Sequence, residues 1–142
     1  MAKVEEAGKR PLVFRSARIF DGDSDALIEG RDVVVAGGVI EDVAAPDPRR
    51  DKDAEVIDCS GCVLMPGLID AHVHVYAAGL NITRVVQSPM SYLAHFAAKF
   101  LHGCLDRGFT TVRDVGGADV GLASAIRDGL LGTVRGCFTG AA

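Results

Sequence analysis

The sequence predicts an α/β protein in which a small all-β unit precedes alternating strands and helices. As far as Pro66, short β-branched runs are separated by turn residues, which is the pattern of successive strands. After Pro66, apolar runs alternate with helical patterns, which is the rhythm of a parallel βαβ sheet. At 142 residues the chain is long enough to bury a core. We expect a β unit over residues 1–66 and a βαβαβ segment over residues 67–142.

The first unit contains one clear hairpin signal. Two β-branched runs, residues 33–35 and 39–43, flank Gly37 and Gly38. Adjacent glycines supply the positive φ angles that a two-residue primed turn requires, so we expect a tight hairpin there. Before the hairpin, LVFRSARIF predicts a single strand. After a charged loop, VIDCSGCVLMP predicts two short strands around a Ser-Gly turn.

The second unit begins with the apolar run GLIDAHV, which predicts a buried strand. Residues 76–89 show no clear periodicity and predict a long loop. From Ser91 to Gly108, apolar side chains recur at i, i+3, i+4 and i+7, which is the spacing of an amphipathic helix. We expect Ser91 to cap this helix at its start and Gly108 to end it.

The rest of the chain continues the alternation. FTTVRDVGG predicts a strand that ends in glycines. Residues 118–132 predict a second helix, with Asp119 near its start and Gly129 near its end. TVRGCFTG, at residues 133–140, predicts another strand. This order predicts parallel strands that are joined by right-handed crossovers.

Charge and hydropathy argue against several classes of partner. The net charge is −4 and acidic residues are mixed with basic ones, so the sequence shows no basic stripe and we expect no nucleic-acid partner. The charged N-terminus does not resemble a secretory signal. No apolar run approaches the roughly 18–20 residues that cross a bilayer. We therefore expect a cytoplasmic protein that does not contact membranes.

Four cysteines fit such a location as free thiols rather than as disulfides. They are Cys59, Cys62, Cys104 and Cys137. The first two form CSGC, which lacks the second Cys or His pair of a zinc site of that type. We interpret its Ser-Gly pair as a turn.

Two histidines close the apolar run at the start of the second unit. Asp70, His72 and His74 are spaced by two residues, so in a strand their side chains share one face. Imidazole nitrogens suit Zn²⁺ and other borderline divalent metals. A catalytic zinc needs about three protein ligands and an open position for water, and this pair supplies two. In a parallel α/β barrel, reactive residues lie at such C-terminal strand ends.

These residues carry a family resemblance. MPGLIDAHVH, at residues 65–74, resembles the first-strand signature of the amidohydrolase superfamily of metal-dependent hydrolases. GFTTVRDVGG, at residues 108–117, resembles the second-strand signature of its imidazolonepropionase and Xaa-Pro dipeptidase-like branch. The β unit is similar to the small β-sandwich that precedes the barrel in this family. The resemblance covers nearly the whole chain.

The resemblance implies a TIM-like (β/α)8 barrel, incomplete in this chain, with one or two divalent metal ions, zinc first among them. The metal activates water to attack an amide, peptide or cyclic amide C–N bond of a small-molecule substrate. His72 and His74 match the first metal ligands, and Asp70 matches an acidic residue that supports them. Arg113 and Asp114 match an Arg-Asp pair with a structural or site-lining role. Because these two are adjacent in a strand, only one of them can face the barrel interior.

In this family the remaining ligands and the catalytic residue come from later strands, so the catalytic residue of this chain is unknown. We expect an N-terminal portion of a hydrolase that is inactive alone. His95 and His102 lie on the predicted helix, outside a barrel, and we expect them to take no part in catalysis.

Two other hypotheses stay open. The first is a non-catalytic truncated relative that binds another chain or forms a homo-oligomer, because an open parallel sheet exposes edges and an apolar face. The second is an unrelated structural zinc site that CSGC and the histidines form together.

Overall fold

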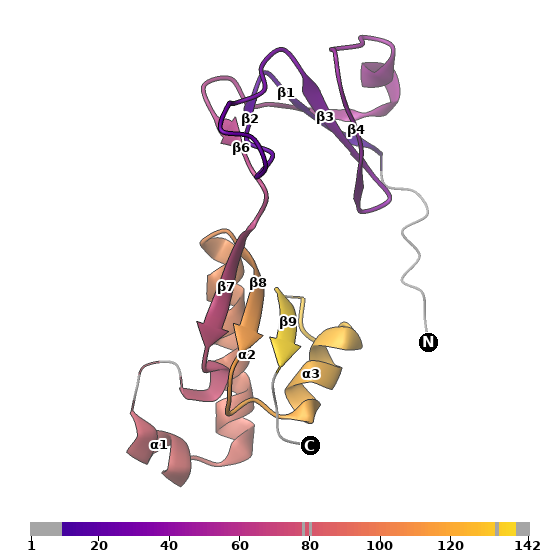
Figure 1. The fold of residues 1–142 in the computed structure, drawn as a ribbon. Coiled ribbons are helices and arrows are strands. Elements are labelled where there is room, and N and C mark those ends of the chain that lie inside the picture. The colour runs from indigo at the N-terminus through magenta and orange to yellow at the C-terminus, as the bar shows by residue number, and fades with distance from the viewer. Residues whose placement is uncertain (1–9, 78, 80, 133, 139–142) are drawn as a thin grey trace. The chain divides into compact units, whose positions relative to one another are not determined.

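The structure is a computed structural model that describes residues 10–77, 79, 81–132 and 134–138 (Figure 1). The chain divides between Pro66 and Gly67 into two compact units, Met1–Pro66 and Gly67–Ala142. The fold is mixed α/β. The described part of the first unit contains strands and one 3₁₀ turn, and in the second unit α-helices connect the strands. None of the described helices is long and apolar enough to span a membrane.

The first unit contains one sheet of four strands and one sheet of two. The larger sheet has the order β4-β3-β1-β5, and the smaller one pairs β2 with β6. Their bounds are Leu12–Arg15 for β1, Arg18–Ile19 for β2, Asp32–Ala36 for β3, Val39–Ala44 for β4, Glu55–Asp58 for β5 and Val63–Leu64 for β6, with a 3₁₀ turn, η1, at Arg50–Asp53. The buried side chains include Val13, Ile19, Val33 and Val34.

The hairpin prediction in this unit is confirmed. β3 and β4 pair antiparallel, and φ is 56° at Gly37 and 77° at Gly38. The Ser-Gly turn is confirmed too, because the N–H of Cys62 donates to the carbonyl of Cys59 over 3.0 Å and Gly61 has a φ of 77°.

The prediction of one strand over residues 12–20 is wrong. β1 and β2 belong to different sheets, and Ser16 between them has a φ of 62°. A non-glycine residue in this left-handed region turns the chain, which separates the two strands. At the end of β1, the Arg15 guanidinium binds the carboxylates of Asp32 and Asp51, and so joins β1, β3 and η1.

The second unit is a three-stranded parallel sheet of order β7-β8-β9, covered by helices. The strands run side by side in one direction, so their C-terminal ends lie at the same end of the sheet, and α1 lies beyond the end of β7 (Figure 1). The bounds are Leu68–Val73 for β7, Val75–Ala77 for the 3₁₀ turn η2, Ile82–Gln87 for α1, Met90–Asp106 for α2, Phe109–Asp114 for β8, Val120–Arg127 for α3 and Arg135–Phe138 for β9. The predicted order of strands and helices and their parallel pairing are confirmed.

The core of this unit lies where α2 and α3 meet the sheet. Leu101, Ala97 and Val112 are 0% exposed, and Leu122 of α3 and Val73 of β7 join them. Apolar side chains of α2 at the predicted spacing therefore pack on the strands. Gly108 has a φ of 87°, and its N–H donates to the carbonyl of Leu105 over 2.9 Å. Gly108 therefore ends the helix as predicted.

Three local predictions differ from the structure. α2 begins at Met90 after Pro89, so Ser91 is not its cap. Residues 76–89 are not one long loop, because they hold η2 and α1; Asn81 caps α1 by accepting the N–H of Arg84 over 2.9 Å. A helix of six residues is too short to show periodicity. The first apolar run is a strand, but it is not buried as predicted: Ile69 is 69% exposed, because no described residue covers its side chain on that face of the sheet.

The start of α3 agrees with prediction, because the carboxylate of Asp119 accepts the N–H of Leu122 over 2.9 Å. Cys59, Cys62 and Cys104 are free thiols, as expected. The side chain of Cys137 lies outside the described part of the chain.

Candidate metal centre

The two histidines lie together at the C-terminal end of β7. His72 is near the end of the strand and His74 directly follows it, and both side chains are exposed. Their ring centroids are 5.4 Å apart, with the ring planes at 72°. Two imidazoles on one tetrahedral zinc, each with a Zn–N bond of about 2.1 Å, place their ring centroids roughly 5 Å apart. The separation of the two rings therefore fits a shared ion.

A hydrogen bond selects the nitrogen that His74 can offer to a metal. Its Nδ1 lies 2.8 Å from the carbonyl oxygen of Gly116. A carbonyl only accepts, so Nδ1 carries the proton and donates it, and the lone pair lies on Nε2. Such a bond from the second ring nitrogen fixes both the tautomer and the orientation of a metal-binding histidine.

Gly116 belongs to the glycine-rich end of the second motif, after β8. The loop that follows β8 therefore orients His74, which follows the neighbouring strand β7. Sequence reasoning missed this residue, because a backbone carbonyl has no signature in a sequence. The only available signal was that both motifs lie at the ends of predicted neighbouring strands.

Asp114 holds the backbone that directly follows the histidine pair and the backbone at Gly116. It is 1% exposed. Its Oδ2 accepts the N–H of Val75 over 2.7 Å, and its Oδ1 accepts the N–H of Gly116 over 2.8 Å. One buried carboxylate thus connects the residue after His74 to the residue whose carbonyl binds its ring. The neighbouring Arg113 is exposed on the other face of β8, as the alternation along a strand requires.

Asp70 contacts the main chain of the site and not an imidazole. Its Oδ1 accepts the backbone N–H of His72 over 3.1 Å. The side chain is partly buried on β7. Asp70 therefore acts on the pair through the backbone conformation at the end of the strand.

Tyr76 fastens the segment that follows the histidines to α3. The ring is 6% exposed, and its hydroxyl donates to Oδ1 of Asp119 over 3.1 Å. Burial, followed by the negative charge of Asp119, raises the pKa of Tyr76 to about 12. The phenol consequently stays protonated at neutral pH and keeps its hydrogen bond.

Within the described residues, no group of three or more His, Cys, Asp or Glu side chains is placed to hold a metal ion. The histidine pair is therefore two ligands of a site and not a complete one, and CSGC has no third ligand in this part of the chain. His95 and His102 lie exposed on α2; Nδ1 of His102 is 2.7 Å from the carbonyl of Ala98 in the same helix.

The comparisons with known proteins agree on one family. Residues 55–99 match the amidohydrolase family. A solved amidohydrolase is 37% identical with a TM-score of 0.83, over 93% of this chain and 32% of that protein. A prolidase solved with N-methylphosphonate-L-proline is 35% identical with a TM-score of 0.80, over 93% of this chain and 32% of the prolidase.

Among curated proteins, adenine deaminase 3 of Rhizobium johnstonii is 29% identical over 131 residues, which are 88% of this chain and 20% of the deaminase. This chain therefore spans about a third of the solved structures and a fifth of the curated relative. Because the solved amidohydrolase shares 37% of its aligned residues and its fold across nearly the whole of this chain, the chain belongs to the amidohydrolase superfamily.

Proposed function

We propose that this chain supplies the first two metal ligands, His72 and His74, of a centre that hydrolyses a C–N bond in a small amide, peptide or cyclic amide. The observation that carries the proposal is the bond between Nδ1 of His74 and the carbonyl of Gly116, which leaves Nε2 available in a ring whose centroid lies 5.4 Å from that of His72. The names of the similar proteins, a prolidase and an adenine deaminase, support the breaking of a C–N bond. The ion is divalent, and imidazole ligands favour zinc.

When bound, such an ion brings the pKa of a coordinated water toward 7 and polarises the substrate carbonyl. The residues of this chain prepare its place. The two imidazoles present nitrogen lone pairs at the C-terminal end of the parallel strands. Asp114 keeps the backbone after His74 and the backbone at Gly116 together, so that the ring of His74 keeps its orientation. Asp70 supports His72 from within the strand.

The complete centre needs more than the described residues supply. A catalytic zinc uses about three protein ligands, and two are in place here. We propose that the βαβαβ segment is the first part of a (β/α)8 barrel, that its later strands carry the other ligands and the proton-transfer group, and that the 142-residue chain alone does not turn over.

Zinc binding to the full chain, measured by competition with a chromophoric chelator, tests the ligand assignment. We expect weak binding of one ion that His72→Ala and His74→Ala each abolish. His102→Ala is the matched control, since this histidine is also exposed but lies on α2, and it should leave binding unchanged. Binding that survives both the His72 and the His74 substitution would refute the assignment.

An activity assay tests the need for further ligands. Dipeptides, N-acyl amino acids and cyclic amides are incubated with the full chain and added Zn²⁺. We expect no hydrolysis above background. Robust turnover that His72→Ala abolishes would show that two histidines suffice, and would contradict the proposed missing ligands.

A second candidate is a non-catalytic module that binds another chain or a second copy of itself. One observation favours it: on the edge strand β7, Ile69 is 69% and Leu68 42% exposed, so apolar surface and an unpaired strand edge face solvent within the described residues. Light scattering tests it, because this function predicts oligomers and a clean monomer at high concentration would contradict it.

A cytoplasmic location and the lack of nucleic-acid and membrane partners stay predictions.

A further inference from the structure

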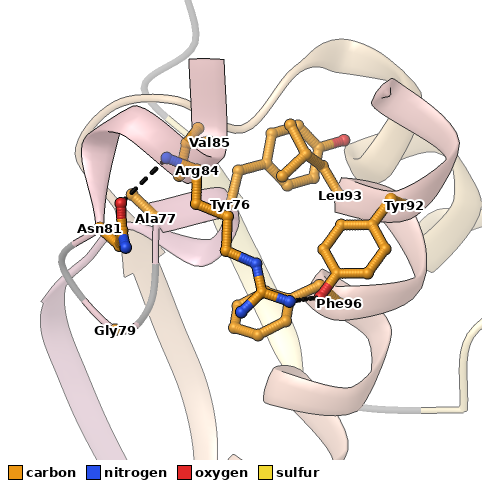
Figure 2. A pocket seen from close by; sticks show the side chains of 9 residues that line it. All are labelled: Tyr76, Ala77, Gly79, Asn81, Arg84, Val85, Tyr92, Leu93 and Phe96. Atoms are coloured by element: carbon orange, nitrogen blue, oxygen red, sulfur yellow. Dashed lines mark hydrogen bonds between the residues drawn. The ribbon is translucent and has the colours of Figure 1, made fainter. Parts of the chain in front are cut away.

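The second unit contains a cavity that the histidine pair does not line. It lies between η2, α1 and α2 and has a volume of about 260 Å³ (Figure 2). Its walls are mostly apolar and aromatic, from Tyr76, Val85, Tyr92, Leu93 and Phe96. A cavity of about 150 Å³ lined by apolar side chains is enough to bind benzene. This cavity therefore has room for one aromatic ring and a substituent.

Arg84 places a positive charge at the cavity wall. It reaches from α1 toward Tyr92 and Phe96 of α2 (Figure 2). Its guanidinium lies 5.3 Å from the centre of the Tyr92 ring, and one of its nitrogens contacts the Tyr92 hydroxyl. Among the described residues no carboxylate pairs with this guanidinium. The hydrogen bond and the cation–π contact with Tyr92 hold the guanidinium at the cavity wall while its charge stays uncompensated.

A neighbouring groove extends this positive surface along α2. It shares Arg84, Tyr92 and Phe96 with the cavity, and adds Lys99 and Arg107. Lys99 lies on α2, and Arg107 directly follows the last residue of that helix, so both line the groove from the C-terminal half of α2. The described residues that line the cavity and the groove include no Asp or Glu. The groove that adjoins the aromatic cavity is thus lined by three positively charged side chains, Arg84, Lys99 and Arg107.

We propose that the cavity and groove bind a small aromatic phosphate monoester, with its ring in the cavity and its phosphate on Arg84 and Lys99. The aromatic walls suit a planar ring, and Arg84 offers the fork of N–H donors that matches phosphate oxygens. A phosphate monoester carries a charge of about −1.5 to −2 at neutral pH, which suits several cations better than the single charge of a carboxylate does. This site requires no metal and is separate from the proposed hydrolytic centre.

Calorimetric titration of the full chain with phenyl phosphate tests the proposal. Phenol supplies the ring without the charge, and inorganic phosphate supplies the charge without the ring, so each should bind at least about tenfold more weakly than phenyl phosphate. Benzoate separates phosphate from carboxylate recognition, and it should also bind more weakly. Affinity should fall as ionic strength rises, since the contacts are exposed ion pairs.

Two variants locate the site. Arg84→Met keeps an unbranched apolar stem but removes the guanidinium, and it should weaken phenyl phosphate binding at least about tenfold. Lys99→Gln, on the exposed face of α2, should weaken it several-fold and keeps the test valid if the first variant misfolds. Arg127→Met removes an exposed arginine of α3 and should change nothing. Phenyl phosphate that binds no tighter than inorganic phosphate, or an affinity that neither the Arg84 nor the Lys99 variant lowers, would overturn the proposal.

Discussion

Gly67, directly before β7, lies so close to β8 that the structure leaves no room for a side chain. An ideal Cβ built on Gly67 would lie 2.1 Å from Oγ1, 2.2 Å from Cγ2 and 2.6 Å from Cβ of Thr110. Rotation of the threonine side chain moves Oγ1 and Cγ2, but its Cβ is fixed to the backbone. Gly67→Ala therefore forces the two strands apart where the N–H of Leu68 donates to the carbonyl of Gly108 over 2.8 Å.

Overpacking that shifts backbone costs about 1–3 kcal/mol. We expect about 2–3 kcal/mol for Gly67→Ala, because the shortest fixed contact is far below van der Waals distance and the shift also strains a strand hydrogen bond. With a urea dependence of about 2 kcal/mol per molar, the unfolding midpoint should fall by roughly 1 M. The chain has no Trp, and both of its Tyr residues lie in the second unit, so tyrosine fluorescence reports the unfolding of that unit alone.

A double-mutant cycle with Thr110→Gly isolates the contact, because that substitution removes all three clashing atoms. We expect a coupling energy of about 2 kcal/mol in favour of the double variant. Gly116→Ala is the matched control: its Cβ would lie 3.9 Å from His74, an ordinary contact, so stability should change by less than about 0.5 kcal/mol. A Gly67→Ala variant as stable as the parent, or a loss of stability that Thr110→Gly leaves unchanged, would show that positions 67 and 110 do not collide.

One pH titration and two unfolding experiments test other contacts. The variant Tyr92→Phe leaves Tyr76 as the only tyrosine of the chain. In a pH titration its phenolate absorbance should appear with a midpoint near pH 12, because burial and Asp119 raise its pKa. A midpoint at the ordinary 10.0 would contradict its burial beside a carboxylate. Since the folded state holds this proton more tightly, the resulting stability is present below about pH 10 and is lost as pH rises toward the folded pKa. Asp114→Asn replaces one acceptor oxygen by a donor opposite a backbone N–H, so urea unfolding should show a loss of about 1–3 kcal/mol, and unchanged stability would be inconsistent with its bridging role. Leu101→Ala should cost about 2–5 kcal/mol in the same assay, against less than about 0.5 kcal/mol for the exposed Leu130→Ala; equal losses would mean that the core of this unit is not centred on α2.

Features that depend on nearby residues could be predicted from the sequence. The hairpin at Gly37 and Gly38 follows from the positive φ that the turn needs. The end of α2 at Gly108 and the start of α3 at Asp119 follow from local backbone and capping chemistry. The spacing of His72 and His74 on one strand face likewise predicted two adjacent rings, which the structure places together.

Features that depend on distant contacts could not be predicted in this way. The break at Ser16 separates two strands that join different sheets, and no glycine or proline in LVFRSARIF marks it. The role of Gly116 depends on a carbonyl that reaches a ring 42 positions away in the chain. The exposure of Ile69 depends on what covers β7, which an apolar run cannot reveal.

Nitrogen-15 NMR of the histidine rings shows whether His72 and His74 bind one metal ion, because it reports the tautomer and the metal-bound nitrogen of each imidazole. At mildly alkaline pH, we expect His74 to carry its proton on Nδ1. On addition of Zn²⁺, the signals of His74 Nε2 and of the His72 ring should shift together, while His95 and His102 on α2 stay unchanged. A proton on Nε2 of His74, or zinc shifts that are confined to His95 and His102, would mean that His72 and His74 do not bind one ion in the way proposed.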